Sequence, residues 1–444
     1  MLTAIRKEMP ALLHLALPII AGQLGQMLLG IADTAMVGWT GVVPLAACSL
    51  ANAVLAIPAI TGLGLLFGVA VRTSAAHGAG ASHEAGEVLR HGCLLALIAG
   101  LALGLMATFG APLLGHLGQS PEVAETARVY FIICGWSMIP AFVFTVFRQY
   151  CEALGAQWPA FWILLGSVLL NVLLNWIFIF GHWGSPVMGI EGAGWATLIS
   201  RVIAMLVLFW YVQKALRFTR QRPVRWIAPL HPQEIRGLVK IGLPSAGQLL
   251  FEAGAFSFAA ILLGWISKEA LAAHHVALSC AAFTFMVPLG LSMASTIRIG
   301  SALGACQPER FRPIAFGAWI AGLAFMGCTA LGFIFFGETV ARWFVDDAVV
   351  IALTAKLLVI AGIFQLLDSQ QVNAMGALRG LHDVRVPMGI VFAAYWLVAL
   401  PVGASLAFRT SLGPIGMWVG LACGLGCAAL LLTLRFLKKT RTEG

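Results

Sequence analysis

The chain has 444 residues, of which 60% are hydrophobic and only 10% are charged, and its formal net charge is +9. About a quarter of the residues of a typical soluble domain are charged. This composition therefore excludes a water-soluble globular protein and predicts an all-α protein embedded in a lipid bilayer.

A membrane-spanning helix needs about 20 consecutive, mostly apolar residues. Windows of that length predict twelve spans joined by short connections, which leave no room for a soluble domain. In chain order, their cores are expected at residues 13–35, 44–70, 92–114, 127–147, 160–181, 190–212, 238–263, 271–296, 314–337, 350–373, 387–408 and 414–436.

The basic residues predict the orientation of these spans. With an even number of spans, both termini lie on one side of the membrane, and that side collects most of the 27 Lys and Arg residues. Cytoplasmic loops carry such an excess of positive charge. We therefore expect a multi-pass protein of the bacterial inner membrane with both termini in the cytoplasm. Topology accounts for the positive charge, so no nucleic-acid partner is expected.

The two halves of the chain resemble each other at an offset near 226 residues. LALP (15–18) aligns with IGLP (241–244), and VRTSAAHGA (71–79) aligns with IRIGSALGA (297–305). Because each half has six spans, both enter the membrane in the same direction, as parallel repeats do. We predict two pseudo-symmetric six-helix lobes, 1–213 and 237–444, around a central cleft. The basic cytoplasmic segment 214–236 links the two lobes.

Three carboxylates are expected deep inside spans: Asp33, Glu252 and Asp368. An ionised group there costs about 2.5–3.5 kcal/mol on insertion scales, so it is retained where it lines a cavity, pairs or titrates. A buried carboxylate can carry a proton, and with other oxygens it can bind Na⁺. These acids are the candidate ion-coupling and substrate residues. The alternative is that they are protonated and only hold helices together.

Polar neighbours at helical spacing favour a wet cavity. Gln26 lies on the Asp33 face, Gln248 lies on the Glu252 face, and the fifth span carries two Asn residues one turn apart. Interhelical amide bonds are also common packing devices, so this pair fits either explanation. The acids do not follow the repeat, since Glu252 aligns with Gln26. The supporting polar residues are Gln26, Asn171, Asn175, Gln248, Gln365 and Gln371.

Several strings resemble the multidrug and toxic compound extrusion (MATE) family of transporters, in its NorM-like branch. They are LALPIIAGQLGQMLLGIADTAMVG at the start of the chain, GLPSAGQLLFEAGAF (242–256), LGLSMASTIRIGSALG (289–304) and LLDSQQVNAMGALRGLHD (366–383). The resemblance implies export of bulky, often cationic drugs in antiport against Na⁺ or H⁺. It also implies a cation site, able to hold Na⁺, at Glu252 and Asp368, and an N-lobe acid at Asp33. Phe364 stands where many members have tyrosine, which removes one oxygen from that site.

Other classes of protein fit the sequence less well. No G-x-x-x-x-G-K-[ST] phosphate loop occurs, which argues against ATP as the energy source, and no catalytic cluster indicates a membrane enzyme. A flippase for a lipid-linked precursor would need basic residues in its cleft, whereas the in-span charges are predominantly acidic. We therefore expect a monomeric exporter of small molecules by alternating access, with no cofactor other than its coupling ion.

Overall fold

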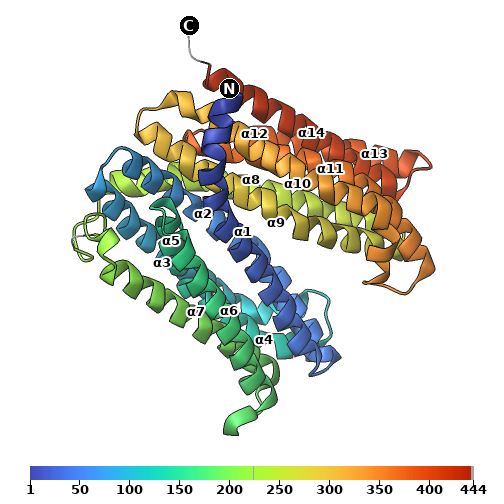
Figure 1. Ribbon diagram of the computed structural model, residues 1–444. Coiled ribbons are helices and arrows are strands. Elements are labelled where there is room, and N and C mark those ends of the chain that lie inside the picture. Colours follow the sequence, from blue (N-terminus) through green and yellow to red (C-terminus); the bar gives the residue numbers. More distant parts are fainter. Residues whose placement is uncertain (224, 442–444) are drawn as a thin grey trace. The chain divides into compact units, whose positions relative to one another are not determined.

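The computed structural model describes residues 1–223 and 225–441, and every regular element in these ranges is a helix (Figure 1). Twelve helical segments are long and apolar enough to cross a membrane, which confirms the predicted fold class. Val224, in the predicted linker, and residues 442–444, in the predicted second lobe, lie outside the described residues. The main helices are α1 (Leu2–Gly38), α2 (Val42–Gly78), α3 (Ser82–Gly110), α4 (Pro121–Trp136), α5 (Met138–Ala153), α6 (Gln157–Phe180), α7 (Gly189–Lys214), α8 (Pro232–Ile266), α9 (Lys268–Gly304), α10 (Phe311–Arg342), α11 (Ala348–Gly380), α12 (Arg385–Phe392), α13 (Leu400–Arg409) and α14 (Pro414–Lys439).

Two of the predicted spans are interrupted by irregular turns. The fourth span breaks at Ser137, between α4 and α5. The eleventh contains a π-helix, η5 (Ala393–Ala399), between α12 and α13. A proline follows each interruption, Pro140 and Pro401. Proline has no N–H for the carbonyl four residues earlier and its ring clashes with that carbonyl, so the helix must bend or widen there.

The helices form two compact units, and the boundaries of these units differ from those of the predicted lobes. One unit contains Met1–Ile20 and Gly247–Gly444, and the other contains Ala21–Ala246. We call them the C-unit and the N-unit. Helices α1 and α8 therefore each contribute to both units. The first part of each repeat packs with helices of the other repeat. The division of the sequence into two repeats does not predict this exchange.

An ion cluster anchors the first part of α1 in the C-unit. Glu8 pairs with Arg298 of α9, and its Oε1 lies 2.8 Å from Nε of Arg310. Gly290 of α9 lies so close to Ile20 that an added Cβ would come within 2.4 Å of the Ile20 side chain. Charge pairing and close helix contact together hold residues 1–20 in this unit.

An equivalent cluster anchors the first part of α8 in the N-unit. The carboxylate of Glu234 lies 2.6 Å from Nη1 of Arg72 of α2, which also pairs with Glu84 at 3.1 Å. At the repeat offset, Glu234 is the counterpart of Glu8 and Arg72 is the counterpart of Arg298. The same ion pair thus forms twice, each time between one repeat and the other.

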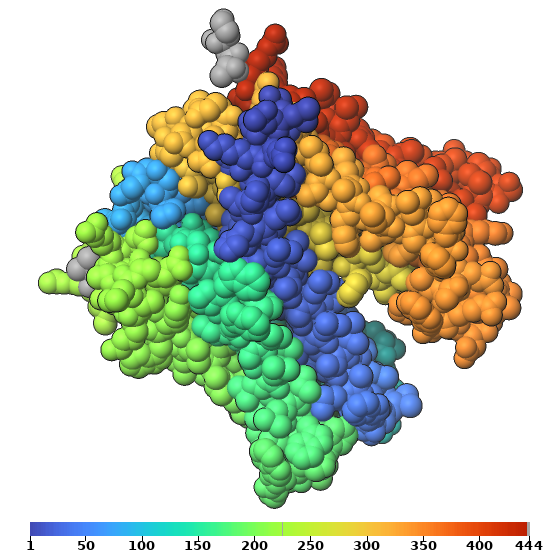
Figure 2. All heavy atoms as spheres, viewed as in Figure 1, coloured from blue at the N-terminus to red at the C-terminus, as the bar shows by residue number. Residues whose placement is uncertain are grey.

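Helix α1 is exposed along much of its length, as its blue side chains show in Figure 2. Leu17, Leu28 and Ile31 are each more than half exposed. Large apolar side chains on an outer surface are unfavourable in water but match the hydrocarbon of a bilayer. The exposed side chains of α1 therefore agree with a membrane-spanning position.

Candidate functional site

A chain of polar side chains runs through the N-unit from Asp33. Asn175 Nδ2 donates to Asp33 Oδ1 at 2.5 Å and to Asn171 Oδ1 at 3.1 Å. Asn171 Nδ2 in turn donates to Thr197 Oγ1 at 3.3 Å and to Ser200 Oγ at 3.4 Å. Helices α1, α6 and α7 are joined by this network. The structure thus brings Asp33 together with both predicted Asn residues.

The members of this network differ in their exposure to the surroundings. Asn171 and Asn175 are fully buried, whereas Asp33 is only partly buried, so one end of the chain reaches a more open position. Arg201 of α7 is close enough to interact electrostatically with Asp33. Asn175 Oδ1 is buried without a hydrogen-bond partner among the described residues. The network therefore offers both carboxylate and amide oxygens next to a single guanidinium group.

Gln26 was predicted to support Asp33 from the same helical face. Its side chain is exposed, whereas the other members of the network are at least partly buried. The spacing of seven residues puts the two side chains on one side of α1 but two turns apart. The bonds that orient Asp33 come instead from α6.

The second cluster lies in the C-unit and centres on Glu252. The hydroxyl of Tyr395 lies 3.2 Å from Glu252 Oε1 and 3.3 Å from Gln371 Oε1. Tyr395 is fully buried in the π-helix η5. Local π-turns are frequently found at functional sites, because they shift a side chain out of α-helical register. Here the widened turn places a hydroxyl between α8 and α11.

Asp368 belongs to the same cluster. It is 7% exposed, and its carboxylate interacts electrostatically with that of Glu252. Two ionised carboxylates in low-dielectric surroundings repel each other, so the pair favours binding a proton or a cation. The buried guanidinium of Arg379 also interacts with Glu252. The two acids that the resemblance assigned to one site are therefore electrostatic neighbours.

The remaining predicted glutamines of the C-unit have separate partners. Gln365 accepts a short hydrogen bond from Thr284, and Gln248 Nε2 donates to the main-chain oxygen of Val384 at 3.2 Å. Both side chains are buried. No hydrogen bond links either of them to an acid among the described residues. Of the glutamines predicted in this half, Gln371 is the one that shares a hydrogen-bonding partner with Glu252.

Phe364 is buried in an aromatic cluster. Its ring centroid lies 6.0 Å from that of Phe256 and 5.5 Å from that of Trp418, both in edge-to-face orientation. Because phenylalanine has no hydroxyl group, Phe364 offers no oxygen to the Glu252 cluster. Tyr395, which lies in the π-helix η5, supplies a phenolic oxygen to Glu252.

The C-unit cluster contains the ligand type that Na⁺ prefers. Hard cations bind carboxylate, carbonyl and hydroxyl oxygens. Glu252, Asp368, Gln371 and Tyr395 supply such atoms. No group of three or more His, Cys, Asp or Glu that could hold a metal ion occurs among residues 1–223 and 225–441, so only two of these ligands are carboxylates. The same carboxylates can alternatively take up protons.

Several participants were not identified from the sequence. They are Thr197, Ser200, Arg201, Arg379 and Tyr395. Arg201 offered a signal, because a cation within an apolar span needs a neutralising partner. Tyr395 and the two hydroxyl residues offered little, since hydroxyl groups are common in membrane helices and their periodicity does not reveal which helix they face.

Twelve helices able to span a membrane, an internal repeat and carboxylates held in polar networks inside those helices are typical of a multi-pass membrane protein of the transporter class. The family model described as MatE matches residues 18–177 and again residues 244–404, the same offset as the internal repeat. The chain therefore belongs to the multidrug and toxic compound extrusion family.

Known proteins resemble the chain over nearly its whole length. It is 35% identical over 443 residues to "Probable multidrug resistance protein NorM" of Mesorhizobium japonicum, covering 98% of this chain and 95% of that protein. It is 34% identical to "Multidrug resistance protein PmpM" of Pseudomonas aeruginosa, covering 98% and 93%. The crystal structure of the eukaryotic MATE transporter AtDTX14 has the same fold, with a TM-score of 0.88, 21% identity and 99% of both chains covered.

Proposed function

We propose that the protein exports amphipathic, often cationic drugs in exchange for Na⁺ or H⁺. The observation that carries this proposal is the position of three carboxylates inside membrane-spanning helices. Asp33 bonds to a buried amide, Glu252 bonds to a buried phenol, and Asp368 is a charged neighbour of Glu252. The names of the bacterial relatives, which refer to multidrug resistance, support the choice of substrate.

The carboxylates couple two opposite flows by alternating access. In the outward-open state, Glu252 and Asp368 take up Na⁺ or H⁺, which relieves their mutual repulsion and releases a bound cationic drug. In the inward-open state the ion leaves, and the restored negative charge attracts the next drug molecule. A ligand shifts such an equilibrium only through its differential affinity for the two states. Competition for shared carboxylates provides that difference. Asp33 is the corresponding ion-coupling acid of the N-unit.

Transport of a lipid-linked precursor is the second candidate. Arg201 and Arg379 are cations inside spans, and a phosphate-bearing substrate needs such groups. Each of them, however, interacts with a carboxylate, Asp33 or Glu252 respectively. This pairing reduces the positive charge that would be left for a phosphate, so drug export is favoured.

Orientation and assembly complete the proposal. The protein lies in the inner membrane with both termini in the cytoplasm, and we expect it to work as a monomer. The support for the orientation is the concentration of basic residues in the loops on one side, including Lys214, Arg217 and Arg222 near the end of α7.

Separately imposed ion gradients test the proposal. The purified protein would be reconstituted into proteoliposomes and ethidium transport followed by fluorescence, with a Na⁺ gradient or a pH gradient applied alone. One of the two gradients should accelerate ethidium transport against the ion flow, and its collapse by an ionophore should stop it. Ethidium transport that responds to neither gradient would contradict ion-coupled export.

Removing the hydroxyl of Tyr395 should change ion binding and spare the fold. Tyr395→Phe keeps the buried ring but removes an oxygen that contacts the Glu252 carboxylate, and interactions with a charged group contribute about 1.5–3 kcal/mol. If Na⁺ is the coupling ion, its concentration for half-maximal transport should rise about tenfold or more. If H⁺ is the coupling ion, the half-maximal proton concentration should fall instead, because the hydroxyl donates to the ionised carboxylate and so opposes proton uptake. Initial rates over a series of Na⁺ concentrations and pH values measure this shift. Tyr211→Phe in α7 is the matched control, and an equal shift in both variants would contradict the role of Tyr395.

A further inference from the structure

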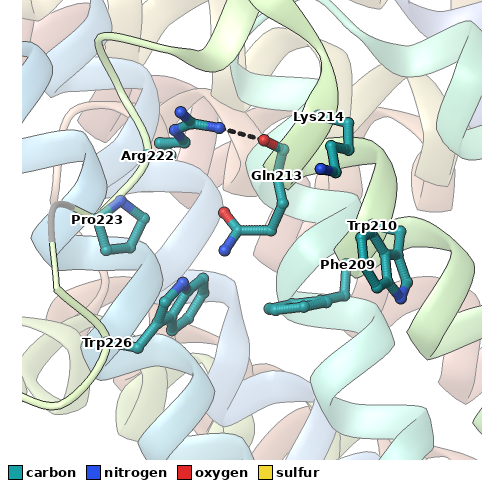
Figure 3. A pocket seen from close by; sticks show the side chains of 7 residues that line it. All are labelled: Phe209, Trp210, Gln213, Lys214, Arg222, Pro223 and Trp226. Atoms are coloured by element: carbon teal, nitrogen blue, oxygen red, sulfur yellow. Dashed lines mark hydrogen bonds between the residues drawn. The ribbon is translucent and has the colours of Figure 1, made fainter.

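A pocket lies at the end of α7 in the N-unit, outside both carboxylate clusters. It is a partly open pocket with a volume of about 440 Å³, within the range of small-molecule sites. Figure 3 shows the last turn of α7 on one side and the following linker on the other. The residues that carry the argument are Phe209, Trp210, Gln213 and Lys214 from α7, and Arg222 and Trp226 from the linker.

The charge of this pocket is positive. Lys214 and Arg222 line it, and none of its lining residues is acidic. Arg222 donates a short hydrogen bond to the main-chain oxygen of Gln213, which offsets the partial negative charge at the end of α7 (Figure 3). The Lys214 ammonium lies 5.6 Å from the centroid of the Trp210 ring. The pocket therefore disfavours a cationic drug and favours an anion.

Two buried polar atoms in the pocket residues lack a partner. Gln213 Oε1, an acceptor, and Trp226 Nε1, a donor, have no hydrogen-bond partner among the described residues. Packing fixes the Trp226 ring, whose centroid lies 5.6 Å from that of Phe209 and 6.1 Å from that of Phe147. Buried polar groups are normally hydrogen-bonded. A ligand with both an acceptor and a donor would satisfy these two atoms together.

An apolar stripe leads along α7 to the pocket. Ile203, Leu206, Val207 and Trp210 are all exposed, and their spacing of three, four and seven residues places them on one face of the helix. Exposed apolar side chains in a membrane helix contact acyl chains, and tryptophan is enriched at the level of the lipid headgroups. The stripe and the positive pocket thus form one continuous amphipathic surface.

We propose that this surface binds phosphatidylglycerol, an anionic phospholipid whose headgroup carries hydroxyl groups. Its phosphate lies between Lys214 and Arg222 and accepts a hydrogen bond from Trp226 Nε1. A headgroup hydroxyl donates to Gln213 Oε1, and the acyl chains follow the stripe at Ile203–Val207. Basic pockets on the cytoplasmic side of membrane proteins bind anionic headgroups in this way. The bound lipid joins the linker to the end of α7, a role separate from ion-coupled export.

Native mass spectrometry of the full-length protein in detergent tests the proposal by titration with phosphatidylglycerol, phosphatidylethanolamine and phosphatidylcholine of matched acyl chains. Each of the two cations should strengthen anionic lipid binding about fivefold, so phosphatidylglycerol should bind at least about tenfold more tightly than phosphatidylcholine. Arg222→Gln and Trp226→Phe should each reduce this preference several-fold. The matched controls are Arg220→Gln, an exposed cation of the same linker, and Trp195→Phe, which changes an exposed indole in α7 away from the pocket.

Equal affinity for the three lipids, or equal losses in the control variants, would overturn the proposal. Phosphatidylethanolamine binding as tightly as phosphatidylglycerol would also overturn it, because the two cations would then select no net charge. Competition by inorganic phosphate or glycerol 1-phosphate at equal concentration would assign the site to a soluble anion. Trp226→Phe keeps an aromatic side chain but removes the N–H together with the pyrrole ring, and Trp195→Phe makes the same change away from the pocket, so the pair tests the Trp226 contact even if Arg222→Gln disturbs the linker.

Discussion

Asp368→Asn is expected to abolish coupled drug transport while leaving the protein as stable as the wild type, or more stable. The amide has nearly the same shape but cannot take up a proton or contribute a negative charge. Loss of one interaction between a charged group and the bound ion costs about 1.5–3 kcal/mol, which corresponds to a reduction in ion binding of about tenfold to 100-fold. The carboxylate itself is unfavourable in low dielectric, so its removal should not lower the unfolding temperature.

Ethidium transport in proteoliposomes and thermal unfolding in detergent would be measured on the same preparations. Asp346→Asn, at an exposed position before α11, is the matched control for this chemical change and should transport normally. Glu252→Gln and Asp33→Asn should behave like Asp368→Asn. Wild-type transport together with a lower unfolding temperature in Asp368→Asn would instead identify Asp368 as a packing residue, and the coupling mechanism would be wrong.

Gly242→Ala should produce the largest loss of stability among the glycine substitutions of α8. A Cβ at this position would lie 1.9 Å from the main-chain oxygen of Leu65 and 2.7 Å from its carbonyl carbon. Backbone atoms cannot move aside as a side chain can, so α8 would have to separate from α2. Overpacking of this kind costs about 1–3 kcal/mol and occasionally more. Alanine gains about 1 kcal/mol over glycine in a helix, which is too little to offset a backbone clash.

Thermal unfolding followed by a cysteine-reactive fluorophore, together with size-exclusion profiles, measures this effect. Gly327→Ala in α10 is the matched control, because a Cβ there would meet no atom within 4 Å. Its unfolding temperature should stay constant or rise. If Gly242→Ala unfolded at the wild-type temperature, the close contact between α8 and α2 would not exist in the membrane protein.

The spans could be predicted because hydrocarbon imposes a strong compositional requirement on every membrane helix. The break in the fourth span and the π-helix in the eleventh could not be predicted. Pro140 and Pro401 mark where α-helical bonding fails, but proline is also tolerated in straight membrane helices. Sequence does not determine whether the chain responds by breaking, as at Ser137, or by widening into a π-turn, as at Ala393–Ala399. Neighbouring helices decide between these outcomes.

The candidate site shows a similar division between what was predictable and what was not. The Asn171 and Asn175 pair was predictable because four residues make one helical turn, and the structure joins both to Asp33. Helical spacing identifies a face but not its partner. Gln248 and Gln365 lie on the predicted faces, yet they bond to Val384 and Thr284.

The first parts of α1 and α8 each pack in the unit formed mainly by the other repeat, and this exchange suggests how the duplicated chain arose. Two identical six-helix proteins that trade their first 20 residues would form a domain-swapped dimer, and each glutamate–arginine contact would then occur twice by symmetry. Glu8 with Arg298 and Glu234 with Arg72 have this relationship within a single polypeptide. Fusion of the genes for such a dimer would preserve both contacts. Neither half, if severed at the linker, would retain every residue of either compact unit.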